Sequence, residues 1–457
     1  MSEIESPDTS PEFEAIRRSL DRAGAELARR FPGESTRAQP VHTVYGGAHL
    51  FRSDTAARMG SFAIHALEEY APDAGTLSAA LGLSPDLAPL VHRRVAEKLR
   101  REPVEDYRID FEDGYGNRPD AEEDGHAGSA AREVATGLAA GTLPPSIGIR
   151  VKPFTPELST RSFRTLEIFL SRLLEDAGRL PPNFVVTLAK VTSREQVSAL
   201  AGLLSHIEKQ SGLEEGAIPL EIMVETPQSI VAPDGTIAIL GLVDAGRGRC
   251  IAAHFGTYDY TASLNVTAAH QNLRHPSCDF ARNVMQVALA GTGVWLSDGA
   301  TNVLPLPPHR SGERTLTKRE IAENRSAVHA AWRTHYDDVR RSLFHAYYQG
   351  WDVHAAQLPT RYAALYSFFL EGLDAASSRL RNFVEKAGQA THVGEVFDDA
   401  ATGQGLLNSF LRAWSCGAIT EEEAVGKSGL TLEELRGRSF PKILHARQAA
   451  ARRETGG

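Results

Sequence analysis

Short apolar runs recur along the first three quarters of the chain, and stretches with helical periodicity separate most of them. Most runs are apolar throughout rather than alternating with polar residues, which is typical of strands covered on both faces. Eight such strands alternating with helices predict a (β/α)8 barrel, more naturally than an open sheet. The eight runs are Val41–Gly46, Tyr107–Phe111, Ile147–Val151, Phe184–Ala189, Leu220–Val224, Cys250–Phe255, Val294–Leu296 and Trp351–His354.

The two ends of the chain show other patterns. Residues 1–11 are predicted to be disordered, and a helix is predicted over residues 12–30 because Ile16, Leu20 and Leu27 fall on one face. After Gln357 the periodicity is helical, with no further strand. We therefore predict three parts, namely an N-terminal tail and helix over 1–40, a barrel over 41–358 and a helical region over 359–457.

Helix caps and long loops add local detail. Thr192 precedes Glu195 at capping-box spacing, and Thr420 and Thr431 precede acidic turns, as caps of a predicted helix pair over 420–450 would. Segments 114–128 and 299–315 look like loops too long to be mere connectors, so we expect them to cover an active site.

The composition is that of an ordinary soluble protein, with 42% hydrophobic residues and a net charge of -9. This charge argues against a nucleic-acid surface, and no apolar run approaches the roughly 18 residues of a membrane-spanning helix. The acidic N-terminus is unlike a signal peptide. Cys250, Cys278 and Cys416 are odd in number and widely spaced. We expect a reduced cytoplasmic protein with neither nucleic acid nor membrane as partner.

Carboxylates stand at the ends of two neighbouring predicted strands. Glu225 closes the run that begins at Leu220, and Asp259 lies just past the run that ends at Phe255. A charge beside a desolvated core is costly, so two hard oxygen ligands there make sense if a divalent cation lies between them. The carboxyl ends of barrel strands meet at one mouth. The sequence therefore predicts a Mg²⁺ or Mn²⁺ site with Glu225 and Asp259 as ligands.

Other strands also end in charged residues. Glu112 and Asp113 follow the second strand and could hold the waters of the metal, while Arg150 presents a planar fork that matches a substrate carboxylate. A metal chelated by a 2-oxo acid stabilises an enolate, which makes carbon–carbon chemistry accessible. Lys190 belongs either to this site or to a pair with a nearby acid. Taken singly, such an acid is often only a helix cap, a role that Asp298 fits equally well.

Several of these segments resemble the HpcH/HpaI aldolase and citrate lyase beta-subunit family. The match keeps the family's order over about residues 41–358, and Gly350–Gln357 is similar to the segment after strand eight in the citrate lyase-like branch. The matching motifs are Ile109-Asp110-Phe111-Glu112-Asp113, Ile149-Arg150-Val151, Ala189-Lys190-Val191, Val224-Glu225-Thr226-Pro227 and Phe255-Gly256-Thr257-Tyr258-Asp259-Tyr260.

This resemblance implies a TIM barrel, usually trimeric or hexameric, that uses Mg²⁺ to cleave or form 3-hydroxy acids or their CoA thioesters. It carries the metal ligands over to Glu225 and Asp259 and the carboxylate-binding arginine to Arg150. Glu112 and Asp113 match the family's acids near the water shell of the metal.

The chain departs from the family pattern at two charged or titratable positions. Lys152 replaces an asparagine and His254 an aliphatic residue, which suits a doubly charged acid or a phosphate. A core histidine is an equally good interpretation of His254. We predict that Arg150, Lys190, Glu112 and Asp113 are catalytic, and that the substrate contacts Arg150, Lys152, His254, Gly256 and Thr257.

Together these observations favour a Mg²⁺-dependent carbon–carbon lyase or aldolase acting on a 2-oxo or 3-hydroxy acid, or its CoA thioester, through an enolate. A phosphoenolpyruvate- or pyruvate-utilising enzyme with phosphoryl chemistry and a non-catalytic barrel subunit are the alternatives. The proton acceptor is not identified by the sequence. Asp374, Asp398 and Asp399 are candidates, supplied by a neighbouring subunit as in some relatives.

Overall fold

The computed structural model describes residues 11–35, 37–310, 314–385, 391–393, 396–398 and 400–455. Eight parallel strands close into a barrel in sequence order, which confirms the predicted (β/α)8 architecture. The strands are β1 (His42–Gly47), β2 (Asp106–Asp110), β3 (Ser146–Val151), β4 (Phe184–Leu188), β5 (Leu220–Val224), β6 (Cys250–Phe255), β7 (Trp295–Ala300) and β8 (Gln349–Asp352).

The apolar runs form strands because both of their faces are covered. Every residue of β2, β4 and β5 is buried. The aliphatic residues Ile109, Ile149, Val186 and Ile222 are fully buried in the core. Parallel strands covered by helices in this way lose their alternation of polar and apolar positions.

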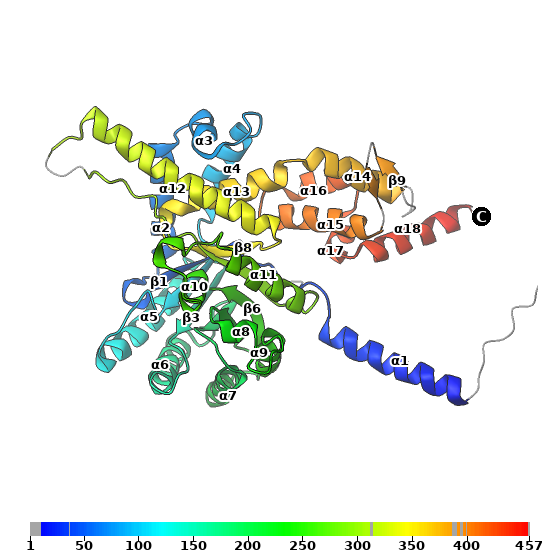
Figure 1. Cartoon of the computed structure of the whole chain (residues 1–457), viewed down its shortest axis with the longest axis horizontal. Coiled ribbons are helices and arrows are strands. Elements are labelled where there is room, and N and C mark those ends of the chain that lie inside the picture. Colours follow the sequence, from blue (N-terminus) through cyan, green and yellow to red (C-terminus); the bar gives the residue numbers. More distant parts are fainter. Residues whose placement is uncertain are drawn as a thin grey trace, which may run out of the picture.

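Helices surround the barrel (Figure 1). They are α2 (Thr55–Tyr70), α3 (Ala74–Leu81), α4 (Ala88–Arg101), α5 (Asp120–Ala140), α6 (Ser159–Ala177), α7 (Arg194–Gln210), α8 (Pro227–Ile230), α9 (Ile239–Ala245), α10 (Thr257–Ser263), α11 (Pro276–Leu289) and α12 (Lys318–Phe344). Short 3₁₀ turns lie at η1 (Ala48–Leu50), η2 (Ala268–His270) and η3 (Ala355–Gln357). None of the helices in the described part of the chain combines the length and hydrophobicity needed to span a bilayer.

A helical C-terminal region follows the barrel, as predicted, and lies at one side of it in Figure 1. Its first helix, α13, packs against α12 and α4 of the barrel. The region contains α13 (Leu358–Leu370), α14 (Leu373–Glu385), α15 (Ala400–Ser415), α16 (Glu421–Ser428), α17 (Leu432–Gly437) and α18 (Phe440–Thr455). The predicted helix pair over 420–450 is thus three helices, and the caps at Thr420 and Thr431 are confirmed by capping boxes.

The prediction of no strand after Gln357 is wrong. Strand β9 (Thr391–Val393) pairs antiparallel with β10 (Val396–Asp398). Each has three residues, too few to show a period of two.

Three other local predictions need correction. The segment 114–128 is not all loop, because α5 begins at Asp120. Acids in the first turn of α5 stabilise the helix, since their negative charge interacts favourably with the helix dipole. The cap of α7 is Ser193, paired with Gln196, one residue later than predicted. Asp298 is not a helix cap; it lies inside β7.

At the N-terminus, α1 (Pro11–Arg30) confirms the predicted helix. The predicted disorder falls on residues 1–10, outside the described residues, and on Pro11, which is the first residue of α1.

Candidate active site at the barrel mouth

One ammonium group at the barrel mouth is surrounded by carboxylates from several strands. Lys190, which follows β4, places its Nζ 2.7 Å from Glu112 Oε1. The same Nζ lies 3.1 Å from Asp113 Oδ2 and 3.1 Å from Asp259 Oδ2. Glu112 and Asp113 come from the turn after β2, and Asp259 from the first turn of α10. The structure therefore brings together four of the residues predicted for the site.

Glu225 joins this cluster from the end of β5. Its Oε1 accepts a hydrogen bond of 2.7 Å from the backbone N–H of Lys190, whose φ is 48°. A residue other than glycine rarely adopts this left-handed conformation. Gly256, after β6, passes so close that a Cβ there would lie 2.3 Å from Glu225 Oε2. Only glycine leaves room for this carboxylate.

Arg150 is held rigidly beside the cluster. Its Nε and Nη2 donate to the two carboxylate oxygens of Asp110 at 2.7 and 2.6 Å. Its guanidinium also lies over the rings of Tyr45 and Trp351, 4.8 and 5.7 Å from their centroids. A bidentate ion pair together with aromatic faces fixes the orientation of the fork. Sequence reasoning missed the two aromatic residues of this arrangement.

The ionisation of the cluster reflects burial and unequal charge. Burial raises the pKa of Glu225 to about 7, and Lys190 and Arg150 offset this only in part. Burial likewise raises the pKa of Glu112 above its ordinary value. For Lys190, burial acts in the opposite direction, but Glu225 and Glu112 outweigh it and raise the pKa of the ammonium. The mouth therefore contains more negative charge than its two cations neutralise.

The donor set fits a divalent cation held by two protein carboxylates. Within the described residues, no group of three or more His, Cys, Asp or Glu side chains is arranged to hold a metal ion. Glu225 accepts from the backbone N–H of Lys190, and Asp259 pairs with the ammonium of the same residue. The charge of Asp259 acts on Glu225, and each side chain supplies hard oxygen atoms. Mg²⁺ commonly takes one or two protein carboxylates and keeps water or substrate at its other positions. The excess negative charge at this mouth is what such an ion would neutralise.

Of the remaining substrate-contact residues predicted from sequence, Thr257 and Gly256 are at the mouth. Thr257 is the first residue of α10 and is 1% exposed. Its Oγ1 is buried and has no hydrogen-bond partner among the described residues. The hydroxyl lies against β7, where a Cβ on Gly299 would be 2.3 Å from it.

The structure does not bring Lys152 to the mouth, which corrects the prediction for this residue. Lys152 is buried, and its Nζ donates to Phe111 O at 2.6 Å and to Glu123 Oε2 of α5 at 2.7 Å. It also lies over the ring of Tyr115. The ammonium of Lys152 therefore links the barrel to α5.

His254 is likewise a core residue rather than a substrate contact. It is fully buried on β6, level with Met223 of β5 and below Glu225. Its Nε2 lies 3.1 Å from Glu221 Oε2, at ion-pair distance but outside hydrogen-bond geometry. Of the two interpretations open from sequence, the structure favours the core histidine.

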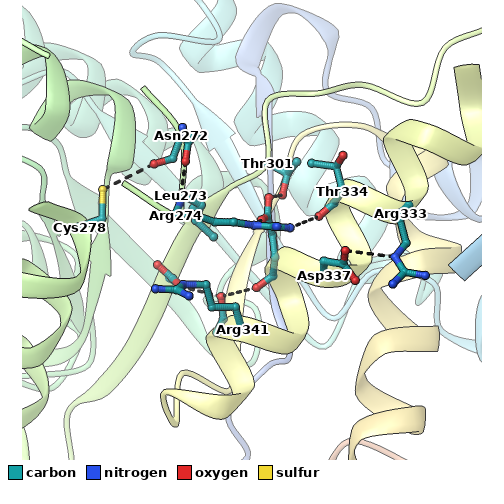
Figure 2. A network of polar contacts seen from close by, with 12 residues as sticks. Asn272, Leu273, Arg274, Cys278, Thr301, Arg333, Thr334, Asp337 and Arg341 are labelled. Atoms are coloured by element: carbon teal, nitrogen blue, oxygen red, sulfur yellow. Dashed lines mark hydrogen bonds and ion pairs between the residues drawn. The ribbon is translucent and has the colours of Figure 1, made fainter. Parts of the chain in front are cut away.

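Asp298 and its surroundings form a structural network at the end of β7. Asp298 pairs with Arg282 of α11 at 3.1 Å and accepts a hydrogen bond from Ser342 of α12. Figure 2 shows the neighbouring contacts, in which Arg274 reaches the backbone oxygen of Thr334 on α12. These bonds tie β7, α11 and α12 together.

Of the three candidate proton acceptors, Asp374 alone has a described side chain. Asp374 is exposed and pairs with Lys427, 2.5 Å away. Asp399 and the side chain of Asp398 lie outside the described residues.

Comparison with solved structures shows the fold of this chain in other proteins. A citrate lyase from Burkholderia xenovorans LB400 matches with a TM-score of 0.53 and 17% identity, over 74% of this chain and 92% of that one. At this identity the likeness shows the barrel fold alone. A Haloferax volcanii malate synthase in its lead(II) complex matches with a TM-score of 0.45 and 14% identity, over 88% and 99% of the two chains.

No protein with a curated description matches the chain. A family model, described as "Domain of unknown function (DUF6986)", matches residues 20–443, which include the whole barrel and most of the helical region. The chain belongs to the DUF6986 family.

Proposed function

We propose that this chain is a Mg²⁺-dependent enzyme that makes or breaks a carbon–carbon bond beside the carbonyl group of a small carboxylic acid. The substrate class is a 2-oxo or 3-hydroxy acid, free or as a CoA thioester. The observation that carries the proposal is the cluster at the mouth, where Glu112, Asp113, Glu225 and Asp259 all contact Lys190. Three of these carboxylates share the one ammonium and Glu225 accepts from the backbone N–H, which leaves negative charge that a bound cation would balance.

Each side chain has a role that follows from its position. Glu225 and Asp259 would hold the metal, and Mg²⁺, when bound, would supply the Lewis acidity that makes the C–H bond next to a 2-oxo group more acidic. Arg150 is pre-oriented by Asp110 and presents positive charge to a substrate carboxylate. Lys190 balances part of the acidic charge and keeps Glu112 and Asp113 in place.

The placement of Lys152 weakens the phosphoenolpyruvate alternative. A phosphate contact by Lys152 would favour that alternative, whereas the ammonium of Lys152 is buried against Glu123. The non-catalytic alternative leaves the surplus of carboxylates at the mouth unexplained, since an uncompensated buried charge is costly. Carbon–carbon chemistry on a carboxylic acid uses every group at the mouth.

The direct test is exchange of the methyl protons of pyruvate in D₂O, followed by NMR with and without Mg²⁺. Exchange requires only enolisation, so the second substrate need not be known. We expect Mg²⁺-dependent exchange that is lost in Glu225→Gln and kept in Glu97→Gln, a matched change at an exposed residue of α4. Absence of exchange in the unaltered chain would contradict pyruvate as the enolised acid. Equal exchange in the Glu225→Gln variant would contradict the assigned site.

A further inference from the structure

Helix α1 exposes an apolar face that nothing in the described structure covers. None of its 20 residues is buried, although Ile16, Leu20 and Leu27 fall on one face. These three side chains are 61, 67 and 62% exposed. Figure 1 shows α1 extending away from the rest of the molecule. Most of the stability of helices in proteins comes from packing of an amphipathic face, so an uncovered apolar stripe points to a contact.

The base of α1 is fixed to the barrel. Arg30 Nη2 lies 2.9 Å from Asp244 Oδ2 of α9, and the N–H of Gly33 donates to Gly291 O, just after α11. These two contacts direct the helix away from the chain's own surface. The stripe on α1 is left uncovered by the described residues of its own chain.

A second exposed apolar surface lies on α8, α10 and α11 of the same chain. A cavity of about 270 Å³ is lined there by residues that include Val231, Leu264 and Phe280, which are 42, 39 and 54% exposed. Val287, two helical turns from Phe280 on α11, is 75% exposed. We call Val231, Leu264, Phe280 and Val287 the α11 patch. Exposed apolar groups that gather in this way mark interaction sites.

The shorter patch on α11 can receive part of the longer stripe on α1. Ile16 and Leu27 are separated by roughly 16 Å along α1, and Phe280 and Val287 by roughly 10 Å along α11, with the cavity beyond Phe280 extending the patch. Both surfaces are apolar, and helices pack by fitting the side-chain ridges of one into the grooves of the other.

We propose that α1 of one copy packs on the α11 patch of a second copy, and that the exchange is reciprocal about a two-fold axis. Every chain carries one stripe and one patch, so a single closed contact covers both surfaces on both chains. In a two-fold contact, each chain supplies both the apolar face of α1 and the α11 patch, so the interface is built twice over.

This contact would also pack against residues next to the proposed metal ligands. The cavity is lined by Pro227, which closely follows Glu225, and by Tyr260, which follows Asp259. The inference does not depend on the proposed function, because it concerns the assembly of the chain alone.

Sedimentation velocity of the full chain tests the contact. We expect the unaltered chain to be a dimer, and both Ile16→Asp/Leu20→Asp and Phe280→Asp/Val287→Asp to be monomers. Ala25→Asp, on the opposite face of α1, is the matched control and stays dimeric. All five positions are exposed, so folding is unaffected, which circular dichroism checks. A monomeric unaltered chain, or stripe variants with unchanged mass, would overturn the proposal.

Cysteine cross-linking distinguishes packing of α1 on a second copy from packing of α1 on its own chain. The natural cysteines are buried, so Leu20→Cys and Val287→Cys introduce the reactive thiols. An equal mixture of the two single variants is expected to give a covalent dimer on oxidation. A doubly substituted chain that closes only within itself, with no covalent dimer from the mixture, would overturn the exchange.

Discussion

Glu221 lies in β5 and Glu225 directly follows that strand, and both are buried, yet the charges around them differ. Glu221 Oε2 lies 2.7 Å from Arg108 Nη2 and accepts a hydrogen bond of 2.8 Å from Thr187 inside the barrel. Burial opposes its ionisation, but Arg108 and His254 outweigh burial and lower its pKa. At Glu225 burial prevails and raises the pKa to about 7.

The difference lies in charge balance rather than in residue type. In the barrel interior, Asp106 and Glu221 share Arg108, with His254 beside them. At the mouth, Arg150 and Lys190 face the carboxylates of Asp110, Glu112, Asp113, Glu225 and Asp259. Burial raises the pKa of Asp106 in the interior as well, so the two clusters differ in degree: two acids share one guanidinium inside, and five acids face two cations at the mouth. A larger excess of acids at the mouth is the arrangement expected of a ligand site, as we propose.

The largest effect is expected on removing the interior carboxylate. Glu221→Ala leaves Arg108 without one of its two buried acids, so the free energy of unfolding should fall by about 3–5 kcal/mol. Urea denaturation measures this change. Glu225→Gln, the comparison directly after the same strand, should cost far less in metal-free protein. Equal losses in the two variants would contradict the distinction between interior and mouth.

Glu225 is expected to make the free energy of unfolding depend on pH. Between its ordinary pKa of 4.5 and about 7, the folded metal-free chain keeps a proton that the unfolded chain has released. The free energy of unfolding therefore falls as pH rises through this window, by on the order of 3 kcal/mol. Urea denaturation from pH 5 to 8 measures the slope. Glu225→Gln should flatten it, and an unchanged slope in that variant would assign the effect to another group.

A smaller effect is expected for Lys190→Met. Loss of the ammonium leaves Glu112, Asp113 and Asp259 without their shared partner. The metal-free chain should lose roughly 1–3 kcal/mol, the range for hydrogen bonds to charged groups. Mg²⁺ should then raise the melting temperature of the variant more than that of the unaltered chain. A smaller rise would show that Lys190 is not a competitor for the cation.

The smallest effect on the site is expected for Lys152→Met. Because the ammonium of Lys152 is engaged with Glu123 and Phe111, Mg²⁺ affinity measured by calorimetry should change by less than about twofold. A large loss of Mg²⁺ affinity would show that Lys152 does contribute to the site.

The barrel and the acids of its mouth could be predicted because parallel strands place their carboxyl ends at one rim. The sequence did not predict how deep in the barrel a side chain lies, or in which direction it points. His254 is on an inward-facing position but one layer too low, level with Met223, and this register is not visible in the sequence. Lys152 follows the last residue of β3, where the alternation of faces no longer holds.

Two further features of the mouth could not be predicted from local sequence. Tyr45 and Trp351 meet, with ring centroids 4.5 Å apart, only because β8 pairs with β1 to close the barrel. Lys190 points its ammonium at the acids from a backbone with positive φ, which no residue pattern predicts for a lysine.

Titration of Mn²⁺ into metal-free protein, with the free ion counted by electron paramagnetic resonance, shows whether the barrel mouth binds a divalent cation. We expect one tight site per chain, with affinity at least about tenfold weaker in Glu225→Gln and in Asp259→Asn, as loss of a ligand or its support requires. The exposed-site variant Glu97→Gln should bind as the unaltered chain does. An unaltered chain that binds no Mn²⁺, or variants that bind equally well, would contradict a metal site at the barrel mouth.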